Sequence, residues 1–73
     1  MNKSQWFDAA AKAGRMLEDG RGEGVAIRYA NLMIQRTPYD RMETWQLLRP
    51  IIPSDYVINF DTSYAGLNIL RAQ

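Results

Sequence analysis

The sequence predicts a small single domain of the α+β class over residues 1–73, with two or three packed helices and a short C-terminal β-hairpin. Alanines are concentrated in the first segment, where apolar residues recur at helical spacing. A Thr-Pro turn then precedes another helical pattern, and the last third is rich in β-branched and aromatic residues. A chain of 73 residues is long enough for one hydrophobic core.

The first helix is predicted to begin after Ser4, a favourable N-cap residue, and to run to about Asp19. Gly20 follows and is expected to cap the C-terminus of the helix. One face of this helix carries the residues Trp6, Ala10, Ala13 and Leu17. Because several residues on and beside this face are small, including Ala11 and Gly14, another element can approach it closely.

A second helix is predicted from Gly24 or Val25 to Arg36. Its polar residues form one narrow stripe, made of Arg28, Asn31 and Gln35. A helix that is apolar on its remaining surface belongs at the centre of a fold or in an interface. Residues 25–29 are also compatible with the start of a strand, which is the lesser alternative.

The segment 37–40 predicts the start of a third helix. Thr37 is the expected N-cap, Pro38 the first helical residue, and Asp40 the acidic residue of a capping-box variant. This helix is expected to run to about Leu48, before Pro50 ends it.

The remaining chain predicts extended structure. Residues 50–53 are expected to be extended and to pack across the helices, and residues 56–60 to form a strand. Residues 61–66 have the composition of a turn, and 67–71 of a return strand. The alternative is a C-terminal helix from about Ser63, since periodicity cannot separate the two for so short an apolar run.

The large apolar residues of the predicted elements are the expected core, because a small domain has few other large side chains to bury. They are Trp6, Phe7, Leu17, Ile27, Leu32, Met33, Trp45, Leu48 and Ile58.

The composition argues against catalysis and against a bound metal or cofactor. The chain has no cysteine and no histidine, so the commonest general base and the commonest metal ligands are absent. Residues 19–24 resemble a calcium loop or a phosphate loop. However, Arg21 and Ala30 occupy positions where calcium requires oxygen ligands, and no strand precedes the glycines. We therefore expect a protein that is not an enzyme and that needs no cofactor.

The charge favours a protein partner over nucleic acid. The chain has nine basic and eight acidic residues, which gives a net charge of +1. A non-specific nucleic-acid binder usually has a larger positive excess. Seven of the nine are arginines, which suit bidentate contacts and stacking at interfaces. The alternative is a helix-turn-helix-like DNA-binding regulator that reads DNA through Arg41, Gln46 and Arg49, or a structural interaction module. Direct DNA binding is the less favoured prediction.

Exposed arginines near the glycine-rich loop and the second turn are the predicted partner-binding residues, with a tyrosine as aromatic anchor. They are Arg21, Arg28, Arg36, Tyr39 and Arg41. No apolar segment typical of a membrane span or a secretion signal is present. We expect a monomeric protein located in the cytoplasm.

The opening MNKSQWFDAAAKAGRMLEDGRGEG, the stretch RYANLMIQRTPYDRMETWQLLRP and the following Ile-Ile-Pro-Ser-Asp resemble the small regulators of host RNA polymerase made by lytic bacteriophages. The resemblance covers the whole chain. It implies binding to bacterial RNA polymerase, near the N-terminus of the largest subunit and at the flap domain. It also implies displacement of the sigma factor, which blocks initiation, and suppression of termination on the elongating enzyme.

Overall fold

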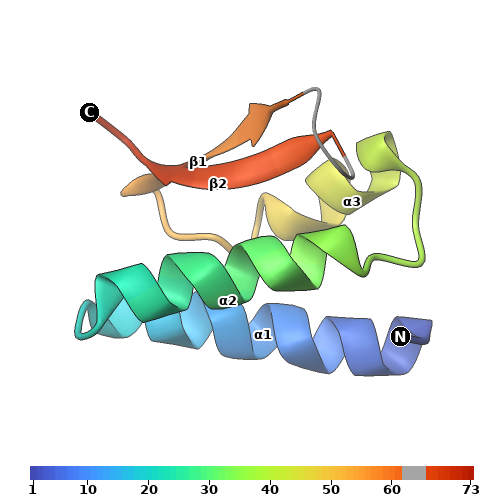
Figure 1. The fold of residues 1–73 in the computed structure, drawn as a ribbon, viewed down its shortest axis with the longest axis horizontal. Coiled ribbons are helices and arrows are strands. Elements are labelled where there is room, and N and C mark those ends of the chain that lie inside the picture. The colour runs from blue at the N-terminus through green and yellow to red at the C-terminus, as the bar shows by residue number, and fades with distance from the viewer. Residues whose placement is uncertain (62–65) are drawn as a thin grey trace.

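Three helices and an antiparallel β-hairpin form the described part of the chain, which comprises residues 1–61 and 66–73 of a computed structural model. The elements are α1 (Lys3–Asp19), α2 (Glu23–Gln35), α3 (Arg41–Leu48), β1 (Tyr56–Phe60) and β2 (Leu67–Arg71) (Figure 1). The helices α1 and α2 lie side by side, and β2 crosses the other side of α2. The prediction of an α+β domain is confirmed.

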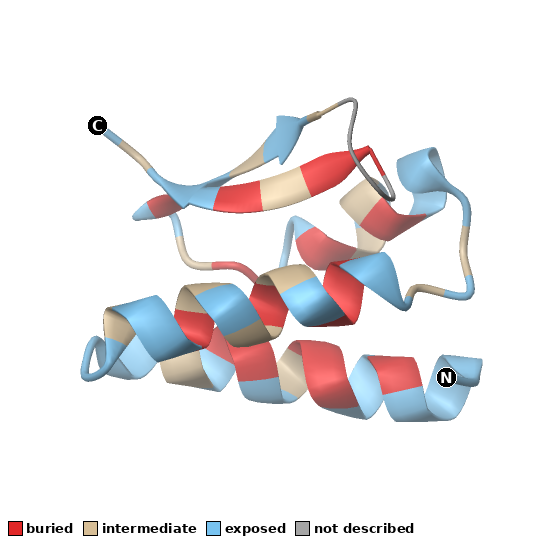
Figure 2. Ribbon diagram, in the orientation of Figure 1, coloured by how far each residue is buried: buried red, intermediate tan, exposed pale blue. Residues whose placement is uncertain are grey.

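The core lies between these layers, with α2 at its centre (Figure 2). It is built from small and large residues together: Trp6, Ala9, Ala10, Ala13, Leu17, Ala26, Ala30, Met33, Ile34, Leu48, Ile52, Tyr56, Leu67 and Ile69. The expectation of a buried core was wrong for Phe7 and Leu32, whose exposed fractions are 41% and 44%. Ile27, Trp45 and Ile58 pack against the core but are only partly buried. The alanine faces allow α1 and α2 to approach closely, so bulky side chains at the margins remain outside.

The first helix begins at a capping box that lies before the predicted cap. The Asn2 side chain accepts a hydrogen bond from the Gln5 backbone N–H at 2.8 Å, and the Asn2 N–H donates to the Gln5 side chain at 3.0 Å. Ser4, the predicted N-cap, therefore lies inside the helix. Three residues beyond Ser4 stands Phe7, which cannot return a hydrogen bond as Gln5 does. The predicted C-cap is confirmed, because Gly20 has the left-handed φ of 77°.

The second helix matches its predicted range to within about two residues, with Arg36 as its C-cap residue. The alternative of a strand at residues 25–29 was wrong. The polar stripe is divided in its environment: Arg28 and Gln35 are exposed, whereas Asn31 is partly buried against β2. Asn31 therefore contacts the hairpin, where its side-chain amide donates a hydrogen bond to the Ile69 carbonyl.

The third helix begins three residues later than predicted. Asp40 is its N-cap and accepts a hydrogen bond from the Glu43 N–H at 2.8 Å. Thr37, the predicted cap, instead accepts from the Tyr39 N–H and bonds to the hydroxyl of buried Thr44 at 2.8 Å. Since Thr44 donates its single proton to the Asp40 carbonyl, Thr37 must be the donor in the hydroxyl pair. The predicted end at Leu48 is confirmed.

The chain after α3 turns, so the prediction of an extended segment over 50–53 was wrong, whereas its predicted packing against the helices is confirmed at Ile51 and Ile52. The backbone N–H groups of Ile51 and Ile52 both donate to the Leu48 carbonyl at 2.9 Å. This turn brings Ile51 against α1 at Gly14, where an added Cβ would lie 2.8 Å from the Ile51 carbonyl oxygen. Gly14 therefore allows the close contact between α1 and this turn.

The hairpin is antiparallel, with Ile58 opposite Ile69 and Phe60 opposite Leu67. Both predicted strands are confirmed over 56–60 and 67–71, and a C-terminal helix over the latter residues was wrong. Ser63 and most of the predicted turn lie outside the described residues. Residues 67–71 form a strand because they pair with residues 56–60, and the sequence pattern of one segment alone does not show such pairing.

Candidate functional site

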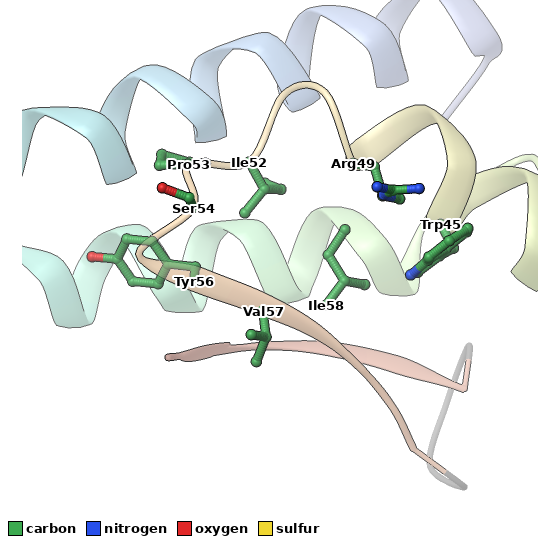
Figure 3. A pocket seen from close by; sticks show the side chains of 8 residues that line it. All are labelled: Trp45, Arg49, Ile52, Pro53, Ser54, Tyr56, Val57 and Ile58. Carbon is green, nitrogen blue, oxygen red and sulfur yellow. The ribbon is translucent and has the colours of Figure 1, made fainter. Parts of the chain in front are cut away.

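An open groove of about 370 Å³ lies between α3 and β1. We call it the α3–β1 groove; it is lined by Trp45, Arg49, Ile52, Pro53, Ser54, Tyr56, Val57 and Ile58. Figure 3 shows Ile52 and Ile58 pointing into the space between the turn and the strand, with Arg49 and Trp45 at one end. The groove is therefore mostly apolar, with a cation at its rim.

The cation at the rim is held by an aromatic ring. Trp45 and Arg49 are separated by four residues, so their side chains emerge on the same side of α3. The Arg49 guanidinium carbon lies 5.0 Å from the centre of the Trp45 ring. Such stacking attracts a cation through the ring quadrupole and leaves its N–H groups free to bind a carboxylate.

A second arginine–aromatic pair lies beside the first. The Arg41 guanidinium carbon is 5.8 Å from the Phe60 ring, and the Phe60 and Trp45 ring centres are 6.2 Å apart. Phe60 is 51% exposed although it belongs to the inner face of β1. These two arginines and two aromatics form one continuous surface, which we call the Arg41–Arg49 surface.

The two arginines of this surface make no ion pair with any described residue. The ion pairs within the described residues join Arg21 to Asp19 and Arg71 to Glu23. Arg71 also stacks on Tyr56, 5.6 Å from its ring centre, and so ties β2 to the start of α2. In contrast, the guanidinium contacts of Arg41 and Arg49 within the described residues are with the rings of Phe60 and Trp45.

The structure divides the sequence-predicted partner residues among separate places. Arg21 lies in the turn between α1 and α2, exposed and paired with Asp19 at 3.1 Å. Arg36 lies at the opposite end of α2, about 20 Å away for a helix of this length. Arg28 is exposed on α2 between them. These three arginines therefore do not form one compact patch.

Tyr39 has a structural role. Its ring packs edge-on against Trp6, at 5.4 Å between ring centres, and against Phe7, at 6.2 Å. The Lys3 ammonium also lies 4.9 Å from the ring centre. Half-buried in this cluster, Tyr39 fixes the loop before α3 against α1. Among the predicted residues, only Arg41 joins the Arg41–Arg49 surface.

Arg36 lines a different hollow, of about 580 Å³, between α1 and α2. Its other lining residues are Met1, Gln5, Asp8, Ala9, Lys12 and Tyr29. Lys12 lies 5.2 Å from the centre of the Tyr29 ring. This hollow is wider and shallower than the α3–β1 groove, and mixes acidic and basic groups.

The sequence analysis assigned Trp45 to the core, and considered Arg49 only for DNA contact. The four-residue spacing between them on a predicted helix was the available signal for a stacked pair. The contribution of Phe60 had no local signal, because its ring meets Arg41 only when β1 folds back toward α3.

In the described part of the chain, no three side chains of the metal-ligating acidic, histidine or cysteine types gather where they could hold an ion. No helix there combines the length and apolar character needed to cross a membrane.

Comparison of the chain with protein-family models, with curated proteins and with solved structures gives no match.

Proposed function

We propose that this protein is a phage-type transcription regulator that binds bacterial RNA polymerase, inhibits sigma-dependent initiation and suppresses termination, without enzymatic activity. The partner and the two effects on transcription come from the resemblance of the chain to the phage regulators. The polymerase regions proposed as binding sites are the N-terminal region of the largest subunit and the flap domain. Such a regulator acts in the cytoplasm of the host cell.

The Arg41–Arg49 surface is the observation that supports a protein partner. Arginine and tryptophan are enriched at binding hot spots, where a ring supplies contact area and a guanidinium supplies directed hydrogen bonds. Here Arg49 is exposed and Trp45 is partly exposed next to an apolar groove, and Arg41 and Arg49 make no ion pair with described residues. Binding by such a surface can displace a competing factor without any chemical step.

Charge reversal tests which surface carries the contact. We expect Arg41→Glu combined with Arg49→Glu to weaken binding to purified bacterial RNA polymerase by a factor of about ten or more. The matched control is Lys12→Glu combined with Arg15→Glu, which makes the same change in net charge at exposed positions of α1 that are not predicted to bind a partner. Initiation from a sigma-dependent promoter and readthrough of a terminator are measured with the same variants.

Three results would contradict parts of the proposal. Failure of the unaltered protein to bind polymerase would reject the partner. Equal loss in both double variants would indicate a general charge effect instead of a site at the Arg41–Arg49 surface. Binding to duplex DNA that declines steeply with salt, in the absence of polymerase binding, would favour the DNA-binding alternative.

A further inference from the structure

The two outer edges of the hairpin differ in their hydrogen bonding. On the β2 edge, the Ile69 N–H donates to Asn31 Oδ1 at 2.8 Å, and the Asn31 amide donates to the Ile69 carbonyl at 3.3 Å. On the β1 edge, no described strand pairs with the backbone. One edge is thus covered by a side chain from α2, and the other is open.

The register identifies the open backbone groups. Antiparallel residues alternate between pairs that exchange hydrogen bonds and pairs that do not. Just outside the strands, the Ala72 N–H donates to the Asp55 carbonyl and the Asp61 N–H to the Gly66 carbonyl. Counting inward by two, Val57–Leu70 and Asn59–Asn68 are the bonded pairs. The N–H and carbonyl groups of Ile58 and Phe60 therefore point to the open edge.

Within β1, the open edge carries no charged residue, proline or bulge that would block pairing with another strand. Exposed edge strands are commonly blocked by a charged residue, a proline or a bulge. The segment Tyr56–Phe60 is Tyr-Val-Ile-Asn-Phe, without charge or proline, and it pairs with β2 in an unbroken register. Its residues also have high strand propensity. Such an edge can accept another strand through main-chain hydrogen bonds.

The surroundings of this edge define the chemistry of the incoming strand. The α3–β1 groove runs next to Ile58 and can receive apolar side chains. Arg41 and Arg49 lie over Phe60 and Trp45 without an ion pair to any described residue. An acidic side chain on the incoming strand complements these arginines. The β1 segment of a second copy of this chain would bring carboxylates only at Asp55 and Asp61, which flank the two ends of the strand, and none within it.

We propose that β1 accepts an extended, acidic segment of a partner protein as a third strand, bonded to the backbone of Ile58 and Phe60. Its apolar side chains enter the α3–β1 groove and a carboxylate meets Arg41 or Arg49. This inference rests on the proposed function only in naming polymerase as the partner. The binding mode itself does not depend on that identity, because any protein with such a segment fits the same edge.

Proline at residue 58 provides a specific test. Ile58→Pro removes an N–H that faces the open edge and leaves the bonded pairs of the hairpin in place. Ile58→Ala is the matched control, since it removes the same side chain but keeps the N–H. We expect Ile58→Pro to bind a synthetic valine–glutamate peptide at least about fivefold more weakly than Ile58→Ala does, as the loss of one hydrogen bond implies. The β2 amide signals report whether each variant keeps its hairpin.

A synthetic peptide with valine and glutamate taking turns at every second position, and serine between them, is the direct probe. It places both side-chain types on the face that carries Ile58 and Phe60. The same peptide with lysine in place of glutamate is its control. We expect the glutamate peptide to slow hydrogen exchange at the Ile58 and Phe60 amides of the unaltered protein. The lysine peptide should leave both exchange rates unchanged. If the glutamate peptide protects neither amide, or if both peptides protect them equally, the proposal is wrong.

Polymerase binding by the same variants separates this inference from the proposed function. Protection by the glutamate peptide without any polymerase binding would reject only the proposed partner. Equal polymerase binding by Ile58→Pro and Ile58→Ala, both with intact hairpins, would reject strand addition and leave the partner in place. A dimer of the unaltered protein that Ile58→Pro dissociates would show that a second copy occupies the edge, and would also overturn the proposal.

Discussion

The side-chain amide of Asn31 hydrogen bonds to both the N–H and the carbonyl of Ile69, 38 residues away in the chain. It imitates the edge of a neighbouring strand, so a helix satisfies the two backbone groups that β2 would otherwise leave open. The same contact fastens the hairpin onto α2, where Ile69 is fully buried. The Asn31 amide therefore covers the β2 edge at Ile69 and, together with the Arg71–Glu23 ion pair, holds the hairpin on α2.

Replacement of Asn31 by alanine should destabilise the protein by about 1–3 kcal/mol, because two backbone groups lose their partner in a partly buried position. Gln35→Ala is the control, since Gln35 lies on the same polar stripe but is exposed. Urea unfolding gives the free energies, and hydrogen exchange should accelerate at the Ile69 amide. Equal free energies for the two variants would mean that Asn31 does not hold the hairpin.

Gly14→Ala should destabilise the protein by about 1–3 kcal/mol, because the new methyl group meets the backbone carbonyl of Ile51. Gly24→Ala is the matched control. An added Cβ at Gly24 has no atom within 4 Å, and alanine is the better helix former, so this variant should gain about 0.5–1 kcal/mol. The thermal midpoints of the two variants should move in opposite directions. A shift in the same direction would contradict the close contact at Gly14.

Asp40→Ala should cost about 0.5–2 kcal/mol through loss of the cap that binds the Glu43 N–H. Asp40→Asn should cost much less, because asparagine is an equally good N-cap residue. Chemical denaturation of both variants distinguishes a hydrogen-bonding role from a role of the charge. If the asparagine variant loses as much stability as the alanine variant, the charge of Asp40 is what matters.

The two tryptophans should differ in their contribution to stability. Trp6 is fully buried and donates its indole N–H to the Met33 carbonyl at 3.2 Å, so Trp6→Ala should cost about 3–5 kcal/mol. Trp45 is only partly buried beside the α3–β1 groove, and Trp45→Ala should cost about half as much or less. Comparable losses from the two substitutions in urea would show that Trp45 belongs to the core, as the sequence analysis expected.

The sequence by itself determined most of the elements. Alanine content, the break at Gly20 and the β-branched composition of residues 56–60 depend on local propensity, which acts within a few residues. The end of α1, the approximate range of α2 and both strands were therefore predicted. Helix starts were less accurate, because several polar residues compete for each cap. Asn2 prevailed over Ser4, and Asp40 over Thr37, by the hydrogen bonds that each can complete.

Tertiary structure decided which side chains are buried and which lie together. Phe7 and Leu32 are exposed because close helix packing uses the alanine faces of α1 and α2, a choice that residue hydrophobicity does not reveal. The strand at 67–71 prevailed over a helix because β1 and α2 supply its hydrogen bonds. The Arg41–Arg49 surface joins α3 to β1. Its residue types could be recognised in the sequence, but the sequence did not predict that they meet in one surface. Such residues are brought together by contacts between distant segments, and these contacts cannot be predicted from the spacing of residues along one segment.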